Sequence, residues 1–446
     1  MDLVSFSVRT KGARNFARRI WTVFARFGLS DARTRRALYC MIDALHGHNA
    51  APTFFIPAVV LWRHASLIAE VARGGAEIGI HGYVHNDYRS LSACEQHKQT
   101  EQAIAVFREA GIPHQGFRNP YFGWTAESLA IFASLGFMYE SNEAVIHDVI
   151  DRNDLPSLLR SGFDKSLALF QAIPCTTYTL RPHFEGTLVR LPTSLPDDEM
   201  LFDRLRITDA ACIGHIWSSV MQNVYDRGGL YVLNLHPERA ILCKDALDML
   251  LRYASSRPLP VWVACLQDIA QWWQEHSQFR MTIIPQGPQY WRVAATASPR
   301  ATLLARHLIV EDQATVPWSD RDVRVQAYCC TVHASQCPCI GLSPRTARSV
   351  YDFLLEQGYP VVFCPHDEAQ TYALYVDQPD GLGTTREEQI QRRSALVEQI
   401  EQLEAPLVHF GNWPGGSRAA LAISGDIDSV TIQDFFLRVH EVHHYA

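Results

Sequence analysis

The sequence predicts an α/β protein in which parallel strands alternate with crossover helices, followed by a second, smaller α/β module. Short apolar runs alternate with helical patterns from residue 3 to about residue 270. The chain has 446 residues, more than the roughly 100–200 residues of one domain. Composition changes at residues 281–300, which contain Pro285, Gly287, Pro288 and Pro299 and are interpreted as a connector.

The first part of the chain repeats one pattern of strand and helix. The strands are expected at residues 4–10, 53–56, 77–80 and 231–235, and the helices at residues 34–45, 66–72, 99–109 and 267–275. Gly111 and Pro113 are typical stop signals after the third of these helices. We expect Trp272 and Trp273, in the last helix, to pack in the core.

The second part and the tail show the same kinds of element. Helices are expected at residues 344–357 and 386–403, and strands at residues 361–364 and 372–376. After Gly411 the tail predicts a strand at 419–424, a turn at 425–429 and a helix at 433–442. The expected division is therefore a domain at 1–280, an accessory module at 281–410 and a C-terminal strand–helix unit at 411–446.

Charge is distributed unevenly along the chain. The net charge is −7, but residues 1–40 carry +7 and the rest −14. Arg14, Arg18, Arg19 and Arg26 could form a basic face for an anionic partner such as a sugar phosphate or lipid phosphate, although most charge runs are only solvated surface. An Arg-rich organelle presequence is a weaker reading of this segment. No nucleic-acid partner is expected.

The sequence also predicts the location of the protein in the cell. No apolar run approaches the roughly 18 residues of a membrane-spanning helix, and the N-terminus has no apolar core of a secretion signal. Eleven cysteines are scattered along the chain, which favours reduced thiols over a disulfide framework. We therefore expect a cytoplasmic protein.

Two histidines follow the strand expected at residues 77–80. His81 and His85 are four residues apart, with Gly82 between them to let the backbone turn. Two imidazoles so placed can bind one metal ion, and imidazole suits zinc and its neighbours. In a chain with 19 histidines, a chance pair held by local hydrogen bonds is the alternative.

Two later motifs accompany this pair. Arg118, Pro120 and Tyr121 follow another short apolar segment, and His236 ends the strand expected at 231–235. Taken alone, the first motif could be an ordinary strand-to-loop turn with a surface arginine. His236 could simply end a strand, but it lies at the end where sites occur in parallel α/β folds.

These motifs occur in the order found in one known family. Residues 50–275 resemble a polysaccharide deacetylase domain of the NodB type, carbohydrate esterase family four. The matching residues are Thr53-Phe54-Phe55 for the TFF strand, His81 and His85 for the HxxxH metal motif, Arg118, Pro120 and Tyr121 for the RxPY motif, and His236 for the Leu-x-Leu-His motif. The resemblance implies a distorted (β/α) barrel.

The family's first motif, a pair of aspartates at the end of the first strand, is missing from its usual place. Ser7 and Arg9 stand there, and an arginine beside a cation would repel it. Asp426 and Asp428 instead close the apolar strand in the C-terminal tail. Our hypothesis is a circular permutation in which the tail delivers both carboxylates to the barrel.

The sequence leaves two alternatives to this hypothesis open. The tail of one chain could complete the site of its neighbour in a homodimer. Asp426 and Asp428 could also only shape a turn, since Gly-Asp after a strand is common turn chemistry.

The resemblance also implies a role for each residue. Asp428, His81 and His85 would bind a divalent metal, expected to be Zn²⁺, and Asp426 would act as the general base, oriented by Arg118. The Tyr121 backbone N–H would stabilise the oxyanion, and His236 would protonate the leaving amine.

Two further patterns carry weaker expectations. Residues 191–198 resemble a loop of some family members that could line the cleft, although such loops need no function. The cluster of Cys329, Cys330, His333, Cys337 and Cys339 permits a structural zinc site, but its spacing fits no standard zinc motif, and cysteines are often simply buried.

Together these residues predict a metal-dependent hydrolase that removes an N-acyl group, expected to be acetyl, from an amino sugar in a glycan, glycolipid or sugar nucleotide. One rival is a non-catalytic carbohydrate-binding module with a degenerate site, which the change at residues 7 and 9 would favour. Another is a metal-independent amide or ureide hydrolase of the same fold.

Overall fold

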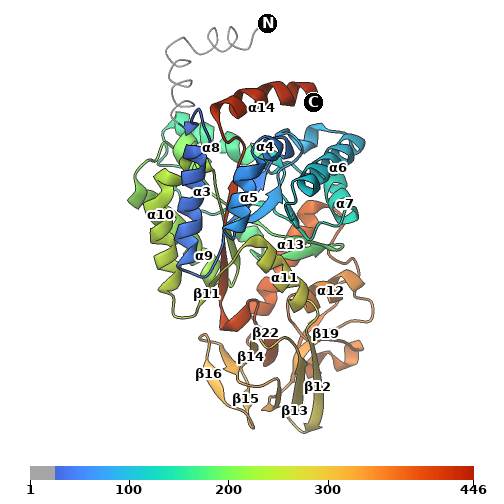
Figure 1. Ribbon diagram of the computed structural model, residues 1–446. Coiled ribbons are helices and arrows are strands. Elements are labelled where there is room, and N and C mark those ends of the chain that lie inside the picture. The colour runs from blue at the N-terminus through green and yellow to red at the C-terminus, as the bar shows by residue number, and fades with distance from the viewer. Residues whose placement is uncertain (1–25, 446) are drawn as a thin grey trace.

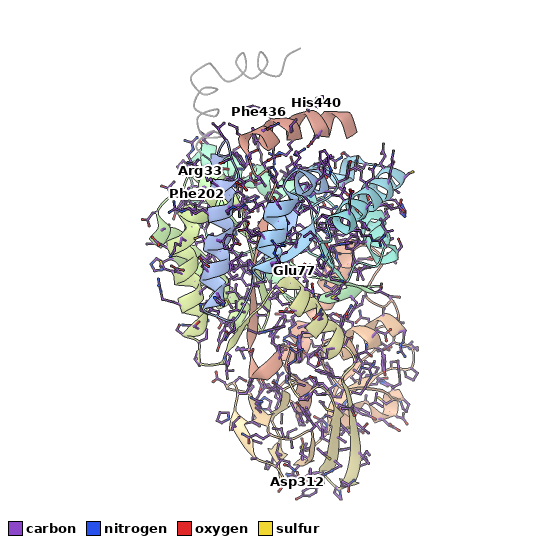
Figure 2. All side chains as sticks on the ribbon, in the orientation of Figure 1. Arg33, Glu77, Phe202, Asp312, Phe436 and His440 are labelled. Carbon is purple, nitrogen blue, oxygen red and sulfur yellow. The ribbon has the colours of Figure 1, made fainter. Side chains whose placement is uncertain are left out.

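The structure is a computed structural model that describes residues 26–445. It has a large helix-covered body and a smaller, strand-rich module, with helix α14 at the end remote from that module (Figure 1). The strand expected at residues 4–10, with Ser7 and Arg9, lies outside the described residues, as do Arg14, Arg18 and Arg19.

The large body is built on one twelve-stranded sheet. Eleven strands follow the order β6-β5-β9-β10-β23-β1-β2-β3-β4-β8-β7, and β11 also pairs with β23. The strands are β1 Thr53–Ile56, β2 Glu77–Ile80, β3 Gly116–Phe117, β4 Tyr139–Glu140, β5 Ala144–Ile146, β6 Ile173–Pro174, β7 His183–Glu185, β8 Leu188–Arg190, β9 Thr193–Leu195, β10 Leu230–Leu235, β11 Val261–Val263 and β23 Ala419–Asp426. All these pairings are parallel except β7 with β8. This order confirms the predicted α/β fold class.

The C-terminal strand β23 occupies the centre of this sheet. It pairs in parallel with β10 over Ala420–Gly425 and with β1 over Ser424–Asp426. Each of its eight residues is buried, as expected of a strand covered on both faces, and its sequence is accordingly a nearly continuous run of small and apolar residues. Residues more than 350 positions apart in the chain therefore lie side by side.

Helices flank the sheet and form many of the connections between its strands. They are α3 Ala32–His46, α4 Ala58–Arg63, α5 Ala65–Arg73, α6 Ala93–Glu109, α7 Ala126–Ser134, α8 Ser157–Leu169, α9 Ala210–Asp226, α10 Pro237–Ser255, α11 Leu266–His276 and α14 Ile432–Tyr445. Helix α6 begins with a capping box formed by Ser92 and Glu95. Trp272 and Trp273 on α11 are fully buried, which confirms their predicted place in the core.

The accessory module contains three small sheets, ordered β12-β13-β18-β15, β16-β17-β14-β22 and β20-β19-β21. Its elements are β12 Arg280–Gly287, β13 Tyr290–Thr296, β14 Leu303–Arg306, β15 Ile309–Val310, β16 Thr315–Pro317, β17 Asp322–Val325, β18 Cys329–His333, β19 Cys337–Leu342, α12 Arg348–Glu356, β20 Val361–Phe363, β21 Tyr372–Val376, α13 Arg386–Glu401 and β22 Leu407–Phe410. The first two sheets are antiparallel and the third is parallel.

Two predictions about this module were wrong. Residues 281–300 are not a loose connector, because most of them form the antiparallel pair β12–β13. Pro285 is tolerated there because β12 is an edge strand, where a missing N–H costs no inner ladder bond. Helix α12 begins at Arg348 and not at residue 344, because Ser343–Thr346 forms a turn closed by the Thr346 N–H and the Ser343 carbonyl.

Two observations concern the whole described chain. All eleven cysteines are free. None of the helices within residues 26–445 combines the length and the apolar character that crossing a bilayer requires.

Candidate active site

The candidate residues gather at one edge of the large sheet. Strand β2 ends just before His81, β3 just before Arg118 and β10 just before His236, while β23 ends with Asp426 itself. These strands run parallel, so their carboxyl ends meet at the same edge, where sites occur in such folds. Figure 1 shows α14, which follows β23, at this end of the body.

Three of these side chains converge on one point. The Nε2 atom of His81 lies 3.5 Å from Oδ1 of Asp428, and the Nε2 atom of His85 lies 3.2 Å from the same oxygen. Gly82, between the histidines, has φ +80°, a conformation that other residues rarely adopt. The structure therefore brings together, within one chain, the pair after β2 and the aspartate after β23.

The protonation of His81 favours a cation at this point. Nδ1 of His81 lies 2.7 Å from the Arg118 carbonyl oxygen, which can only accept, so Nδ1 carries the proton. Burial lowers the pKa of His81 to about 4, which keeps the ring neutral near pH 7. Its Nε2 lone pair therefore faces a carboxylate oxygen with no proton between them, an arrangement that a cation would stabilise.

The donor set fits a divalent metal. Tetrahedral zinc with bonds of about 2.0–2.2 Å separates its ligand atoms by roughly 3.3–3.6 Å, close to the distances observed here. Oδ1 of Asp428 is buried without a hydrogen-bond partner in the described chain. The bond from His81 to a backbone carbonyl is the support that metal-binding histidines usually have. Three protein ligands leave a fourth position open for water or substrate, as in catalytic zinc sites.

Asp428 is held from its other side by helix α14. Its Oδ2 accepts a hydrogen bond of 2.7 Å from Nη1 of Arg438. Burial alone would raise the pKa of Asp428, but His85, Arg438 and His81 hold it well below the usual range. Asp428 is therefore an anion with one oxygen engaged and the other directed at the two histidines.

Asp426 lies beside this point, fixed by two partners. Its Oδ1 accepts a hydrogen bond of 3.1 Å from Nη1 of Arg118, and its Oδ2 one of 2.9 Å from the Asn234 amide. Burial would raise its pKa, but Arg118, His81 and His236 lower it. A carboxylate that stays ionised and rigidly oriented can act as a general base.

Arg118 is fully buried and is the centre of this network. Besides Asp426, it donates to Asn234 at 2.6 Å, to Ser424 Oγ at 2.9 Å and to the Ser141 carbonyl at 3.1 Å. Its guanidinium carbon lies 4.4 Å from the centroid of the Phe55 ring. Arg118 therefore links the end of β3 to β10, to β23 and to the segment that follows β4.

His236 has a buried acidic partner. Its Nδ1 lies 2.7 Å from Oδ1 of Asp198, whose Oδ2 accepts a hydrogen bond from the His236 backbone N–H. Burial would lower the pKa of His236, but Asp198 raises it well above its ordinary value. His236 is therefore protonated near neutral pH, as a general acid must be.

Tyr121 stands at the mouth of the site. The residue is 40% exposed, and its ring contacts that of His85 edge-on, with centroids 4.9 Å apart. Its backbone has φ 58° and ψ 18°, an uncommon conformation for a residue other than glycine and one that clusters at functional sites.

Two residues of this site, Asn234 and Asp198, were not predicted from the sequence. Asn234 was a detectable signal, because it is a polar residue within the apolar run of β10, two positions before His236 and on the same face. Asp198 lies in the segment 191–198, which was expected only to line the cleft. Nothing local marks it as the partner of a histidine 38 residues later.

Two other expectations concern residues away from this edge. Groups of three or more possible metal ligands among residues 26–445 are His81–His85–Asp428 and Asp197–Asp198–His236, and the cysteine cluster at 329–339 forms none. Arg26, expected on a basic face, is paired with Asp203, at 3.1 Å between Nη1 and Oδ2.

Known proteins resemble part of this chain. Residues 31–139 match the family model of polysaccharide deacetylases. Chitooligosaccharide deacetylases of a Bradyrhizobium strain and of Sinorhizobium fredii are 26% and 27% identical; each match covers 36% of this chain and spans 65% and 67% of the relatives' length, respectively. An allantoinase of solved structure is 17% identical with a TM-score of 0.41, over 53% of this chain and 72% of that one. These matches and the His81–His85, Arg118–Tyr121 and His236 motifs make the chain similar to polysaccharide deacetylases of the NodB type.

Proposed function

We propose that this protein is a metal-dependent hydrolase that removes an N-acyl group, acetyl in the first instance, from an amino sugar in a glycan, glycolipid or sugar nucleotide. The observation that supports the proposal is the convergence of three possible metal ligands, an ionised Asp426 and a protonated His236 at one sheet edge. The relatives' substrate makes oligomers of N-acetylglucosamine the first compounds to test.

His81, His85 and Asp428 would hold the metal, and their nitrogen and oxygen donors suit Zn²⁺. A divalent cation bound there would acidify water and polarise an amide carbonyl. Asp426 takes the proton from the attacking water, since it is an ionised carboxylate beside the trio that is not itself a ligand. The Tyr121 N–H donates to the developing oxyanion, and His236 gives its proton to the leaving amine.

We infer that β23 and α14 replace the first strand and helix of the family, so that the domain is circularly permuted. The support is positional: β23 pairs with β1 on one side and β10 on the other, and its carboxyl end supplies both aspartates. In this arrangement a single chain completes its own site. A homodimer and a cytoplasmic location stay predictions.

Removal of the metal should abolish activity, which separates this function from its two rivals. We expect acetate release from the N-acetylglucosamine tetramer to stop after treatment with a chelator and to return on addition of Zn²⁺. Activity that survives chelation would instead support the metal-independent hydrolase. Saccharide binding without any acetate release, at full metal occupancy, would support the non-catalytic binding module.

Replacement of Asp198 by asparagine should change the pH dependence. Asp198 raises the pKa of His236, so the variant should have a lower His236 pKa and lose the general acid at a lower pH. We therefore expect the alkaline limb of the kcat profile to move to lower pH, with the acidic limb, set by Asp426, unchanged. An alkaline limb that stays in place would contradict the role of His236.

A further inference from the structure

A cavity of about 720 Å³ lies between the large sheet and the accessory module. The large body contributes Asp226, Arg227 and Arg418, next to the first residues of β10 and β23, and the module contributes residues such as Trp318 and Glu398. The candidate active site lies at the other end of these strands. Since β23 has eight residues, about 23 Å of strand separates the two sites.

Part of the cavity wall is a closed network of ion pairs. Arg181 bonds to Glu401 at 2.6 Å, Arg306 bonds to Asp322 at 2.9 Å, and His409 lies 3.3 Å from the same Asp322. These groups satisfy one another and join the module to the large body. Other charged side chains of the cavity lining are not part of this network.

Five other charged groups in the lining have no ion-pair partner within residues 26–445. Two are guanidinium groups that donate only to backbone carbonyls: Arg227 to those of Cys175 and Tyr178, and Arg418 to those of Tyr225 and Asp226. Three are carboxylates, those of Asp226, Asp320 and Glu398. Asp226 and Glu398 accept only from glutamine amides, at 2.6 and 3.0 Å.

This mixture of charges restricts the chemistry of a ligand. An anion would meet the three carboxylates, and a cation would meet the two guanidinium groups. A neutral ligand rich in hydroxyl groups suits both, because each hydroxyl donates to a carboxylate and accepts from a guanidinium. Trp318 adds a half-buried indole to the lining, against which the C–H face of a sugar ring can pack. The volume lies within the roughly 300–1,000 Å³ typical of small-molecule sites.

We propose that this cavity is an accessory binding site for a neutral oligosaccharide. The choice of a sugar among hydroxyl-rich ligands rests on the proposed function, whereas the site itself is separate from the catalytic groups. Such a site would retain a glycan chain on the protein between successive reactions at the candidate active site, at the opposite edge of the large sheet.

Titration calorimetry with the N-acetylglucosamine tetramer tests the proposal. The full chain is used with Asp426→Asn as background, so that the ligand is not consumed. Adding Trp318→Ala and Glu398→Ala together should remove one binding site per chain, or weaken it at least tenfold. Trp62→Ala is the matched control, because it removes a 69% exposed tryptophan from α4, outside the cavity.

Two results of this titration would overturn the proposal. An unchanged number of sites and unchanged affinity in the Trp318/Glu398 variant, with the same melting temperature as its background, would overturn the proposal. Binding of inorganic phosphate at this cavity in preference to the tetramer would also overturn it, in favour of an anion site. Absence of metal or of deacetylation would count against the proposed function and leave this titration interpretable.

Discussion

Replacement of Asp426 by asparagine is expected to lower kcat by a factor of about 10²–10⁴, the usual contribution of a positioned acid or base. The asparagine has the same shape and can keep one hydrogen bond to Arg118, but it cannot accept a proton from water. His81, His85 and Asp428 are untouched, so the metal content should remain that of the wild type. Acetate release and metal content, measured on the same preparations, test both halves of this prediction.

Asp209→Asn is a suitable control for this variant. Asp209 caps helix α9 by accepting from the Cys212 N–H at 2.7 Å, and asparagine caps helices about equally well. We therefore expect its activity to equal that of the wild type. A fully active Asp426→Asn would assign the base to another residue, and a variant without metal would show that Asp426 supports the ligands.

Replacement of Arg118 by alanine is expected to lower the free energy of unfolding by about 3–5 kcal/mol, the cost of breaking a buried ion pair by removing one partner. The change leaves Asp426 buried without its cation and removes donors to Asn234, Ser424 and Ser141. Since Arg118 holds the pKa of Asp426 below its usual range, the wild type keeps this stabilisation above the unfolded-state pKa and loses it as pH falls through the folded-state pKa. The difference between the two proteins should therefore be large at pH 7 and shrink on acidification.

Urea unfolding at pH 7 and at acidic pH measures this effect. Arg348→Ala serves as the comparison, because Arg348 pairs with Asp352 at the surface, where such pairs contribute little. Equal unfolding curves for the two variants would show that Arg118 is not the centre of the buried network.

Much of the large sheet could be predicted from local patterns. Strands β1 and β2 have the predicted bounds, because a short apolar run between turn signals marks a buried strand wherever it occurs. The four strand ends were also identifiable, because His81, Arg118 and His236 directly follow an apolar segment and Asp426 closes one. Their meeting at one edge then follows from parallel pairing.

Contacts that depend on the folded chain could not be predicted in this way. Asp198 meets His236, and Arg438 meets Asp428, through the packing of whole elements, which leaves no mark on the nearby sequence. The antiparallel sheets of the accessory module were missed for a related reason. Strand β12 is mostly exposed and carries a proline, and only one residue of β13 is fully buried, so both strands lack the pattern that marks a buried strand.

We expect the C-terminal tail to complete the metal site by supplying Asp428. Divalent metal per chain, measured by plasma mass spectrometry on the wild type and Asp428→Ala purified side by side, tests it most directly. We predict about one metal ion per wild-type chain, as in a single catalytic site with three protein ligands, and far less in the variant, with unchanged circular dichroism. Equal metal in both proteins would contradict the claim, because the tail would then supply no ligand.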